Sequence, residues 1–262
     1  MENVTLDIEG QVATVTLRRP DAMNALNRST KEALLAVLKD VSVDTSIRAV
    51  VPTGVGRAFC VGQDLSELRA DLDTDGAAAW ETVRDHYSPV VKLIATMPKP
   101  VIAALNGVAA GAGAAFALAC DYRLSSATAS INFAFASIGL SADSGATWTL
   151  PRLVGTARAK NLLMRPGSVD ATACLGFGLI DEIVESDLLA GRAAALAAEF
   201  ATGPTLAYAA IRQALVYSAS HSLDETLALE EHLMRETGTS GDHREAIDSF
   251  LAKQKPVFRG GH

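Results

Sequence analysis

The first residues of the chain alternate apolar and polar side chains. Residues 4–8 and 12–17 both follow this period of two, and Glu9-Gly10 between them is typical of a tight turn. The pattern predicts a β-hairpin with one buried face. Short apolar runs that end at glycine or polar residues predict further strands at residues 49–53, 101–105, 122–125 and 180–184.

Helical spacing of apolar positions follows several capping signals. Ser29 with Glu32 three residues later predicts a capped helix that reaches about residue 41, and Asp64 with Glu67 predicts the start of another. The polar, alanine-rich residues 70–79 are expected to form a mobile connection. Further helices are predicted at residues 80–97, 111–119, 146–153, 157–164, 171–175, 190–201, 205–218, 223–236 and 242–253.

The order of these elements runs through the chain without a linker. Strands and helices alternate over the first two-thirds, and helices occupy most of the last third. This order predicts an α/β fold. A doubly wound sheet fits the alternation as well as other α/β architectures do, so periodicity alone does not choose between them.

Small aliphatic side chains supply most of the apolar content. Hydrophobic residues make up 49% of the 262 residues and aromatic residues only 5%, which is typical of closely packed helices and buried strands. The most apolar stretch, residues 101–120, is interrupted by Asn106-Gly107, Gly111 and Gly113. It therefore predicts a buried strand, turn and helix, and not a membrane span.

Charge and cysteine usage restrict the class of partner and the compartment. A net charge of −7 argues against a general nucleic-acid binder, which needs a basic face. Cys60, Cys120 and Cys174 lack the spacing of a disulfide framework, and the first ten residues lack the apolar core of a signal peptide. We therefore expect a cytoplasmic protein that spans no membrane. The five histidines show no metal-ligand spacing, so no metal is expected.

Two glycine-rich segments each follow a predicted strand and lead into a helix. They are residues 57–65 (RAFCVGQDL) and 106–114 (NGVAAGAGA). Small residues at such a junction let main-chain N–H groups point at a ligand, and two donors aimed at one oxygen form an oxyanion hole. Taken alone, either segment is also explained by tight packing of a strand against a helix.

Several ordered motifs together resemble the crotonase (enoyl-CoA hydratase/isomerase) superfamily. The resemblance covers nearly the whole chain, up to residues 250–253. The matching segments are 13–27 (ATVTLRRPDAMNALN), 50–65 (VVPTGVGRAFCVGQDL), 99–121 (KPVIAALNGVAAGAGAAFALACD), 139–153 and 179–184 (LIDEIV). The resemblance implies a spiral of β-β-α units over residues 1–200. It also implies a helical region, 201–262, that serves trimerisation and forms part of the acyl-CoA site.

The same resemblance implies an acyl-CoA thioester as substrate and a homotrimer or a dimer of trimers. The N–H groups of Gln63 and Ala112 would hold the thioester oxygen, and no cofactor is expected beyond the coenzyme A of the substrate. Other implied substrate contacts are Met23, Ala25, Gly62, Asp64, Leu65, Gly111, Ala115 and Phe135. Candidates for the phosphates and adenine of coenzyme A are Arg18, Arg19, Lys253, Lys255, Phe250 and Phe258.

The reaction depends on the acids above this hole. Hydratase-type members use two glutamates, and their positions correspond here to Ala115 and Phe135, which cannot transfer a proton. Asp143 remains, and its surroundings resemble the ring-1,2-epoxyphenylacetyl-CoA isomerase branch and related enoyl-CoA isomerases. A single carboxylate can move a proton between two carbons, which suffices to shift a double bond. The alternative role of Asp143 is to cap the helix that begins near Gly145.

Other functions remain as alternatives. One alternative is a hydratase, in which residues other than the two usual glutamates activate water. Another is an acyl-CoA-binding paralogue that catalyses no reaction. A nicotinamide enzyme is disfavoured, because Gly111-x-Gly113 lacks the third glycine of the dinucleotide fingerprint and no acidic residue follows at the customary distance. An apolar acyl pocket, suited to an aromatic or cyclic group, is expected to be lined by Ala115, Phe116, Phe133, Phe135 and Trp148. His86-Tyr87 is a further candidate for a substrate contact.

Overall fold

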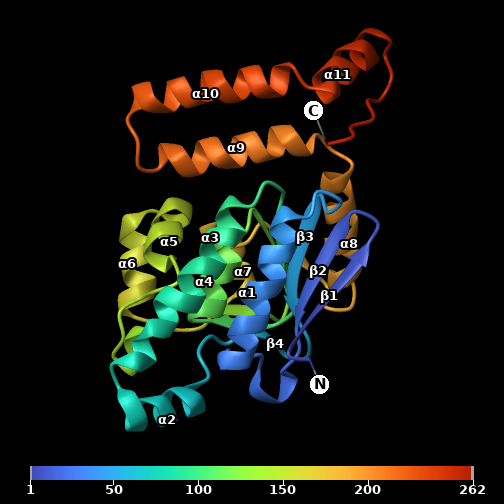
Figure 1. Cartoon of the computed structure of the whole chain (residues 1–262). Coiled ribbons are helices and arrows are strands. Elements are labelled where there is room, and N and C mark those ends of the chain that lie inside the picture. The colour runs from blue at the N-terminus through green and yellow to red at the C-terminus, as the bar shows by residue number, and fades with distance from the viewer. Residues whose placement is uncertain (1, 261–262) are drawn as a thin grey trace.

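Two β-sheets form the centre of the computed structural model, which describes residues 2–260 (Figure 1). In the larger sheet β1 and β2 are antiparallel and the other neighbours are parallel. Its strands, in spatial order, are β1 (Val4–Glu9), β2 (Val12–Leu17), β3 (Ala49–Gly54), β5 (Ile102–Leu105), β7 (Tyr122–Ser126) and β10 (Glu182–Val184). The smaller sheet contains β4 (Ala58–Cys60), β6 (Val108–Ala110), β8 (Ser130–Asn132) and β9 (Val169–Asp170).

Helices surround these sheets and make up most of the second half of the chain. The first half contains α1 (Arg28–Val43), α2 (Leu65–Asp75), the π-helix η3 (Val83–Tyr87), α3 (Ser88–Thr96) and α4 (Ala112–Ala119). The second half contains α5 (Ala146–Val154), α6 (Thr156–Met164), α7 (Ala171–Phe177), α8 (Leu189–Ala201), α9 (Thr205–Ser218), α10 (Leu223–Gly238) and α11 (Gly241–Leu251). Short 3₁₀ turns occur at Pro20–Ala22, Ala78–Trp80 and Ala136–Ile138.

The strands alternate between the two sheets as the chain advances. β3 lies in the larger sheet, β4 in the smaller sheet, and α2 follows; β5, β6 and α4 repeat this order, and β7 and β8 begin it again. Each turn of the chain thus adds one strand to each sheet and then a helix. This is the predicted spiral of β-β-α units, which the structure confirms.

The central strands β3 and β5 of the larger sheet are buried on both faces. Val50 and Ala103 point to one side, into the main core beneath α1, α3 and α4. Val51 and Ile102 point to the other side, where α8 covers them. Because successive side chains of a strand alternate between faces, these strands read as continuous apolar runs and not as alternating ones.

Several local predictions need correction. The helix α1 begins at Arg28 and is capped by Asn27, whose side chain accepts from the Thr30 N–H, so the predicted Ser29 cap is wrong. Residues 70–75, expected to be a mobile connection, continue α2. The single helix predicted at 80–97 is divided into a 3₁₀ turn, η3 and α3. The predicted cap at Asp64 is confirmed.

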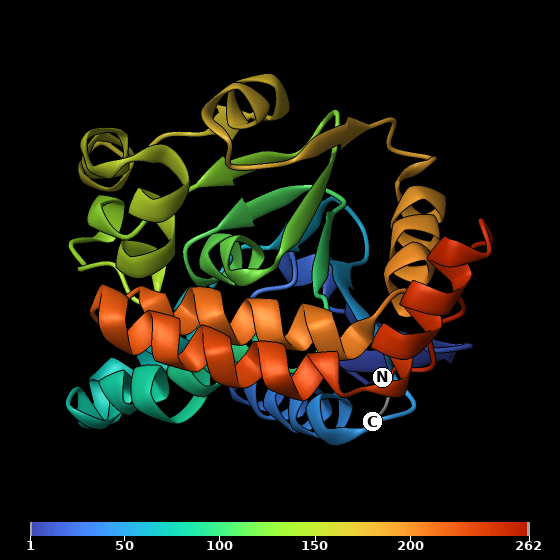
Figure 2. The same cartoon turned by 90° about the horizontal axis from the view of Figure 1, so that it is seen from above.

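The helices α9 and α10 lie side by side across one end of the core (Figures 1 and 2). Arg212 of α9 donates to the carbonyls of Ile94 (2.6 Å) and Met97 (3.1 Å) at the end of α3. Arg48 donates to the Thr205 hydroxyl at 2.7 Å and to the Phe258 carbonyl at 3.0 Å. These buried guanidinium groups attach the C-terminal region to the core.

Within residues 2–260, no helix has the length and apolar character needed to cross a membrane.

The start of α4 lies directly against the end of β4. A Cβ atom placed on Gly113 would lie 2.1 Å from the Cys60 carbonyl oxygen, far inside van der Waals contact. A Cβ on Gly107 would lie 2.1 Å from the Arg57 carbonyl oxygen. The two glycines therefore allow the second glycine-rich segment to pack against the first, main chain against main chain.

We predict that Gly113→Ala lowers the free energy of unfolding by about 3 kcal/mol, because the added methyl forces the two segments apart. Urea denaturation followed by circular dichroism measures the change. The matched control is Gly191→Ala in α8, where the new Cβ meets open space. That substitution should be neutral or stabilising by up to about 1 kcal/mol. Equal stability of Gly113→Ala and the wild type would contradict the packing argument.

Candidate active site

A cavity of about 340 Å³ lies where the two glycine-rich segments meet the loop before α5. Most of its lining is apolar, and its polar side chains are those of Gln63, Tyr87, Ser137 and Asp143. The structure thus brings together residues that are up to 118 positions apart in the sequence, with the lining formed by Ala25, Val61, Gln63, Leu65, Tyr87, Gly111, Ala112, Ala134, Phe135, Ser137, Ile138, Leu140 and Asp143.

In the first glycine-rich segment, the Gln63 N–H points away from the adjacent segment at Leu26. Leu26 donates to the Gly62 carbonyl (2.8 Å) and accepts from the Asp64 N–H (3.2 Å), so the Gln63 peptide between them faces the other way. Among residues 2–260 no acceptor bonds to the Gln63 N–H. Gly62 has a φ of +83°, which favours glycine at the turn before Gln63. The main-chain donor is therefore available to a ligand in the cavity.

The second segment supplies another such donor at the start of α4. Gly111 has a φ of +52° and a ψ of −125°, a conformation that is sterically open only to glycine. Its carbonyl accepts from the Ala115 N–H (3.1 Å), which leaves the Ala112 N–H in the unpaired first turn of the helix. A Cβ on Gly62 would lie 3.1 Å from the Ala112 nitrogen, so the two donor-bearing segments are in contact.

Asp143 lines the cavity from the loop before α5. Burial raises the pKa of its carboxyl above the ordinary value, and the Ser144 hydroxyl, which donates to it at 2.7 Å, opposes the rise. The carboxylate does not cap α5. That helix begins after Gly145 without a side-chain cap, and Asp143 contributes only its carbonyl, which accepts from the Ala146 N–H at 2.9 Å. The helix-capping alternative for Asp143 is therefore wrong.

Four of the predicted substrate contacts line the cavity: Ala25, Leu65, Gly111 and Phe135. The other four lie around it. Gly62 forms the turn before Gln63, Met23 ends a 3₁₀ turn in a left-handed conformation, and Ala115 is buried within α4. Asp64 caps α2 and pairs with Arg19 at 3.0 Å.

The expectation that Trp148 lines the acyl pocket is wrong. Trp148 is 38% exposed and lines a separate cavity with Arg152 and Arg212. Arg19, a candidate for the coenzyme A contacts, donates to the Asp64 carboxylate at 3.0 Å and to the Ala25 carbonyl at 2.5 Å. These bonds link the first segment to the loop at Ala25.

The remaining candidates for coenzyme A contacts lie at the surface. Arg18, Lys253, Lys255 and Phe250 are exposed, and the Phe258 carbonyl accepts from Arg48. No group of three or more potential metal ligands occurs in the described part of the chain.

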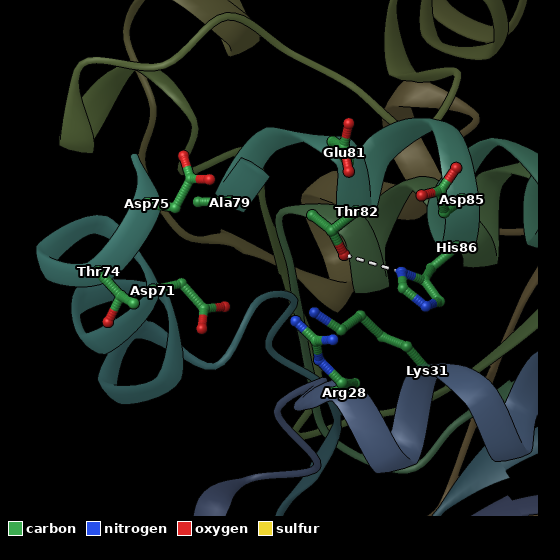
Figure 3. A pocket seen from close by; sticks show the side chains of 10 residues that line it. All are labelled: Arg28, Lys31, Asp71, Thr74, Asp75, Ala79, Glu81, Thr82, Asp85 and His86. Atoms are coloured by element: carbon green, nitrogen blue, oxygen red, sulfur yellow. Dashed lines mark hydrogen bonds between the residues drawn. The ribbon is translucent and has the colours of Figure 1, made fainter. Parts of the chain in front are cut away.

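Tyr87 is a polar lining residue that sequence reasoning had grouped with His86. The two side chains separate at η3, where Tyr87 enters the cavity with Asp143 and His86 enters a neighbouring polar cavity. Arg28 and Lys31 extend from α1 into this second cavity, toward Thr82 and His86 (Figure 3). The nearby Pro89, which lacks an N–H, was the only local sign of the irregular helix.

Comparisons with known proteins show which family this chain is similar to. A family model described as "Enoyl-CoA hydratase/isomerase" matches residues 7–261. The chain is 40% identical over 260 residues to the 1,2-epoxyphenylacetyl-CoA isomerase of Escherichia coli (strain K12), covering 99% of both proteins. It is 40% identical over 257 residues to a "Probable enoyl-CoA hydratase" of Rhodobacter capsulatus, covering 98% of both.

Solved structures show the same similarity. A crystal structure of a Mycobacterium abscessus protein, named as an enoyl-CoA hydratase/isomerase, superimposes with a TM-score of 0.94 at 39% identity. The match covers 98% of this chain and 99% of that protein. The resemblance found from sequence motifs is therefore confirmed over the whole length of the fold.

We predict that Asp143→Asn raises the free energy of unfolding at pH 7. The native state disfavours the charged carboxylate, since its pKa is raised above 3.8, and the neutral amide removes this cost. The raised pKa makes native Asp143 bind its proton more tightly, so the gain should shrink as the pH falls toward 3.8. Urea titrations at pH 7 and pH 4 measure it, with the exposed Asp73→Asn as control. A less stable Asp143→Asn at pH 7 would contradict the argument.

Proposed function

The chain belongs to the enoyl-CoA hydratase/isomerase family, and we propose that it shifts a double bond within an enoyl-CoA thioester. The observation that carries this proposal is that one cavity holds the half-buried carboxylate of Asp143 together with two main-chain donors that no acceptor among residues 2–260 engages. The donors are the N–H groups of Gln63 and Ala112. The substrate carries the coenzyme A, and the proposal requires no other cofactor.

The proposed reaction begins with the thioester oxygen between the Gln63 and Ala112 N–H groups. Asp143 removes a proton from the α-carbon of a 3-enoyl-CoA, and the electron pair of the broken C–H bond delocalises onto that oxygen. The donors stabilise the negative charge as it develops, which is the largest contribution expected from such a site. The protonated Asp143 then delivers its proton to the γ-carbon, and the double bond lies between the α- and β-carbons.

The burial of Asp143 supports its role as a base. Its raised pKa brings the carboxyl closer to the acidity of the carbon that it must deprotonate, while the Ser144 hydroxyl keeps it oriented. The apolar side chains of Phe135 and Leu140 line the same cavity, which disfavours water around the reacting carbons. We propose an apolar acyl group for this cavity, and the name of the Escherichia coli relative favours a ring.

Hydration of a 2-enoyl-CoA is the second candidate, supported by the name of the Rhodobacter relative. It needs one group to activate water and another to protonate the α-carbon. The positions of the two hydratase acids hold Ala115 and Phe135, and neither side chain carries an exchangeable proton. A single enzyme preparation separates the two reactions, because only hydration yields a 3-hydroxyacyl-CoA.

We predict that the wild type interconverts 3-enoyl-CoA and 2-enoyl-CoA and that Asp143→Asn lowers kcat by about 10²–10⁴-fold, because the proton carrier is lost. Chromatography of the CoA esters measures both the isomers and any 3-hydroxyacyl-CoA. The control is Asp73→Asn, a carboxylate remote from the cavity. Full activity of Asp143→Asn would sink the mechanism, and accumulation of 3-hydroxyacyl-CoA would favour the hydratase.

We also propose that residues 201–262 form a subunit interface that builds a trimer or a pair of trimers. Leu215 of α9 and Met234 of α10 are 67% and 73% exposed, and more apolar side chains lie on the same region at Ile211, Leu223, Leu227, Phe250 and Leu251. Such a large exposed apolar surface favours association.

The three cysteines are buried and free, which supports the proposal of a cytoplasmic location.

We predict a particle of three or six times the chain mass of 27.4 kDa in light scattering after gel filtration. The double substitution Leu215→Asp and Met234→Asp should shift it toward the single-chain mass, since unpaired charges are costly to bury. Ile8→Asp places the same charge on the exposed hairpin, where it should have no effect. A wild type that elutes as a single chain at micromolar concentration would refute the proposal.

A further inference from the structure

We propose that Tyr87 is a positioning residue that fixes the first oxyanion donor through the side chain of Gln63. The inference rests on the proposed function, in which the Gln63 N–H holds the thioester oxygen. The main-chain N–H and the side-chain carboxamide of Gln63 have different surroundings. Its N–H faces the cavity, and its side-chain carbonyl accepts a hydrogen bond from the Tyr87 hydroxyl. Fixing the carboxamide limits the movement of the main chain that carries the N–H.

A second buried donor holds the same oxygen. The Lys31 ammonium lies 3.4 Å from Gln63 Oε1 and 3.3 Å from Glu67 Oε1. Lys31 comes from α1 and Glu67 from α2, so helices on both sides support the arrangement. The carboxylate partner keeps the ammonium in place, because a buried charge without a partner is strongly disfavoured. Gln63 is therefore clamped between two donors from different elements.

Burial makes this clamp persistent. Tyr87 is 3% exposed and Lys31 is 4% exposed. Burial also raises the pKa of the Tyr87 phenol well above its usual range, so the hydroxyl keeps its proton and donates. A buried donor that loses its partner cannot turn to bulk water for another. Both donors therefore favour the one position of the Gln63 carboxamide that satisfies them.

The ring of Tyr87 contacts the element that carries the other oxyanion donor. It packs edge-on against Phe116, with 6.1 Å between ring centroids. Phe116 lies on α4, one turn after Ala112. Tyr87 thus contacts the first segment through its hydroxyl and the helix of the second segment through its ring. We infer that this side chain sets the relative position of the two N–H groups.

The π-helix explains how Tyr87 reaches this place. Within Val83–Tyr87 the backbone bonds span five residues, and the helix changes to α3 at Ser88. Pro89 supplies no N–H to continue the regular pattern backward. The irregular turn sends His86 into the polar cavity of Figure 3 and Tyr87 into the proposed active site. Single π turns in helices are frequent at functional sites.

A double-mutant cycle tests the route through Gln63. Tyr87→Phe removes only the hydroxyl, and Gln63→Ala removes the carboxamide but keeps the main-chain N–H. We expect each to lower kcat by about tenfold with little change in KM, the loss of one hydrogen bond that acts on the transition state. The double variant should lose no more than either single variant. Tyr122→Phe, on β7 against Phe200, is the matched control and should be unaffected.

The carbonyl of a bound thioester gives a readout independent of turnover. The probe is butyryl-CoA with an isotope label in its carbonyl, whose infrared stretch moves to lower frequency when oxyanion donors polarise it. We expect Tyr87→Phe and Gln63→Ala to lose part of this shift. Asp143→Asn should retain it, because Asp143 acts on carbon and not on the carbonyl oxygen.

Two results would overturn the inference. One is an additive loss in the double variant, which would show that Tyr87 acts independently of Gln63. The other is a Tyr87→Phe enzyme with unchanged kcat and unchanged carbonyl shift. Failure of the proposed function is distinguishable from both. In that case the wild type interconverts no enoyl-CoA isomers, while the carbonyl shift still reports whether the two N–H groups hold the thioester and whether Tyr87 affects them.

Discussion

The contact between the carbonyl of Cys60 and the Cα of Gly113 is the constraint on which this site depends. With no side chain between them, the end of β4 and the start of α4 approach within main-chain distance. That approach brings the Gln63 and Ala112 peptides to one cavity. The smaller sheet maintains it, because β4, β6 and β8 pair in parallel and fix the ends of the segments that follow them.

Main chain and side chains have separate tasks in this arrangement. The N–H groups proposed to stabilise charge belong to the backbone, whose course is set by strand pairing and helix geometry and whose final alignment is proposed to depend on Tyr87. The group proposed to move the proton is a side chain on a loop, and its carboxyl is kept in an environment that disfavours its charge. Such a group costs stability at neutral pH and is retained where reactivity requires it. The apolar lining serves both tasks, because it strengthens the electrostatic interactions inside the cavity.

Sequence reasoning succeeded where the pattern was long or the chemistry local. The hairpin β1–β2, the strands of the larger sheet and the helices of the last third were predicted with small boundary errors. It missed β4, β6, β8 and β9, because strands of two or three residues show no periodicity and depend on distant partners. It brought Gln63, Ala112 and Asp143 together only through family resemblance. It named Tyr87 only together with His86, since an irregular helical turn decides which cavity each of these side chains enters.

The use of a peptide group as the proposed donor at position 112 has a consequence for how the gene tolerates change. At position 112, where no role is proposed for the side chain, any amino acid other than proline keeps an amide hydrogen, so drift at this codon leaves the proposed donor itself intact. Position 113 is the reverse case, in which the smallest alternative residue already collides with a carbonyl. The fold therefore protects its chemistry through a neighbour that has no side chain, and variation in a lineage should be permitted at the donor and forbidden one residue later.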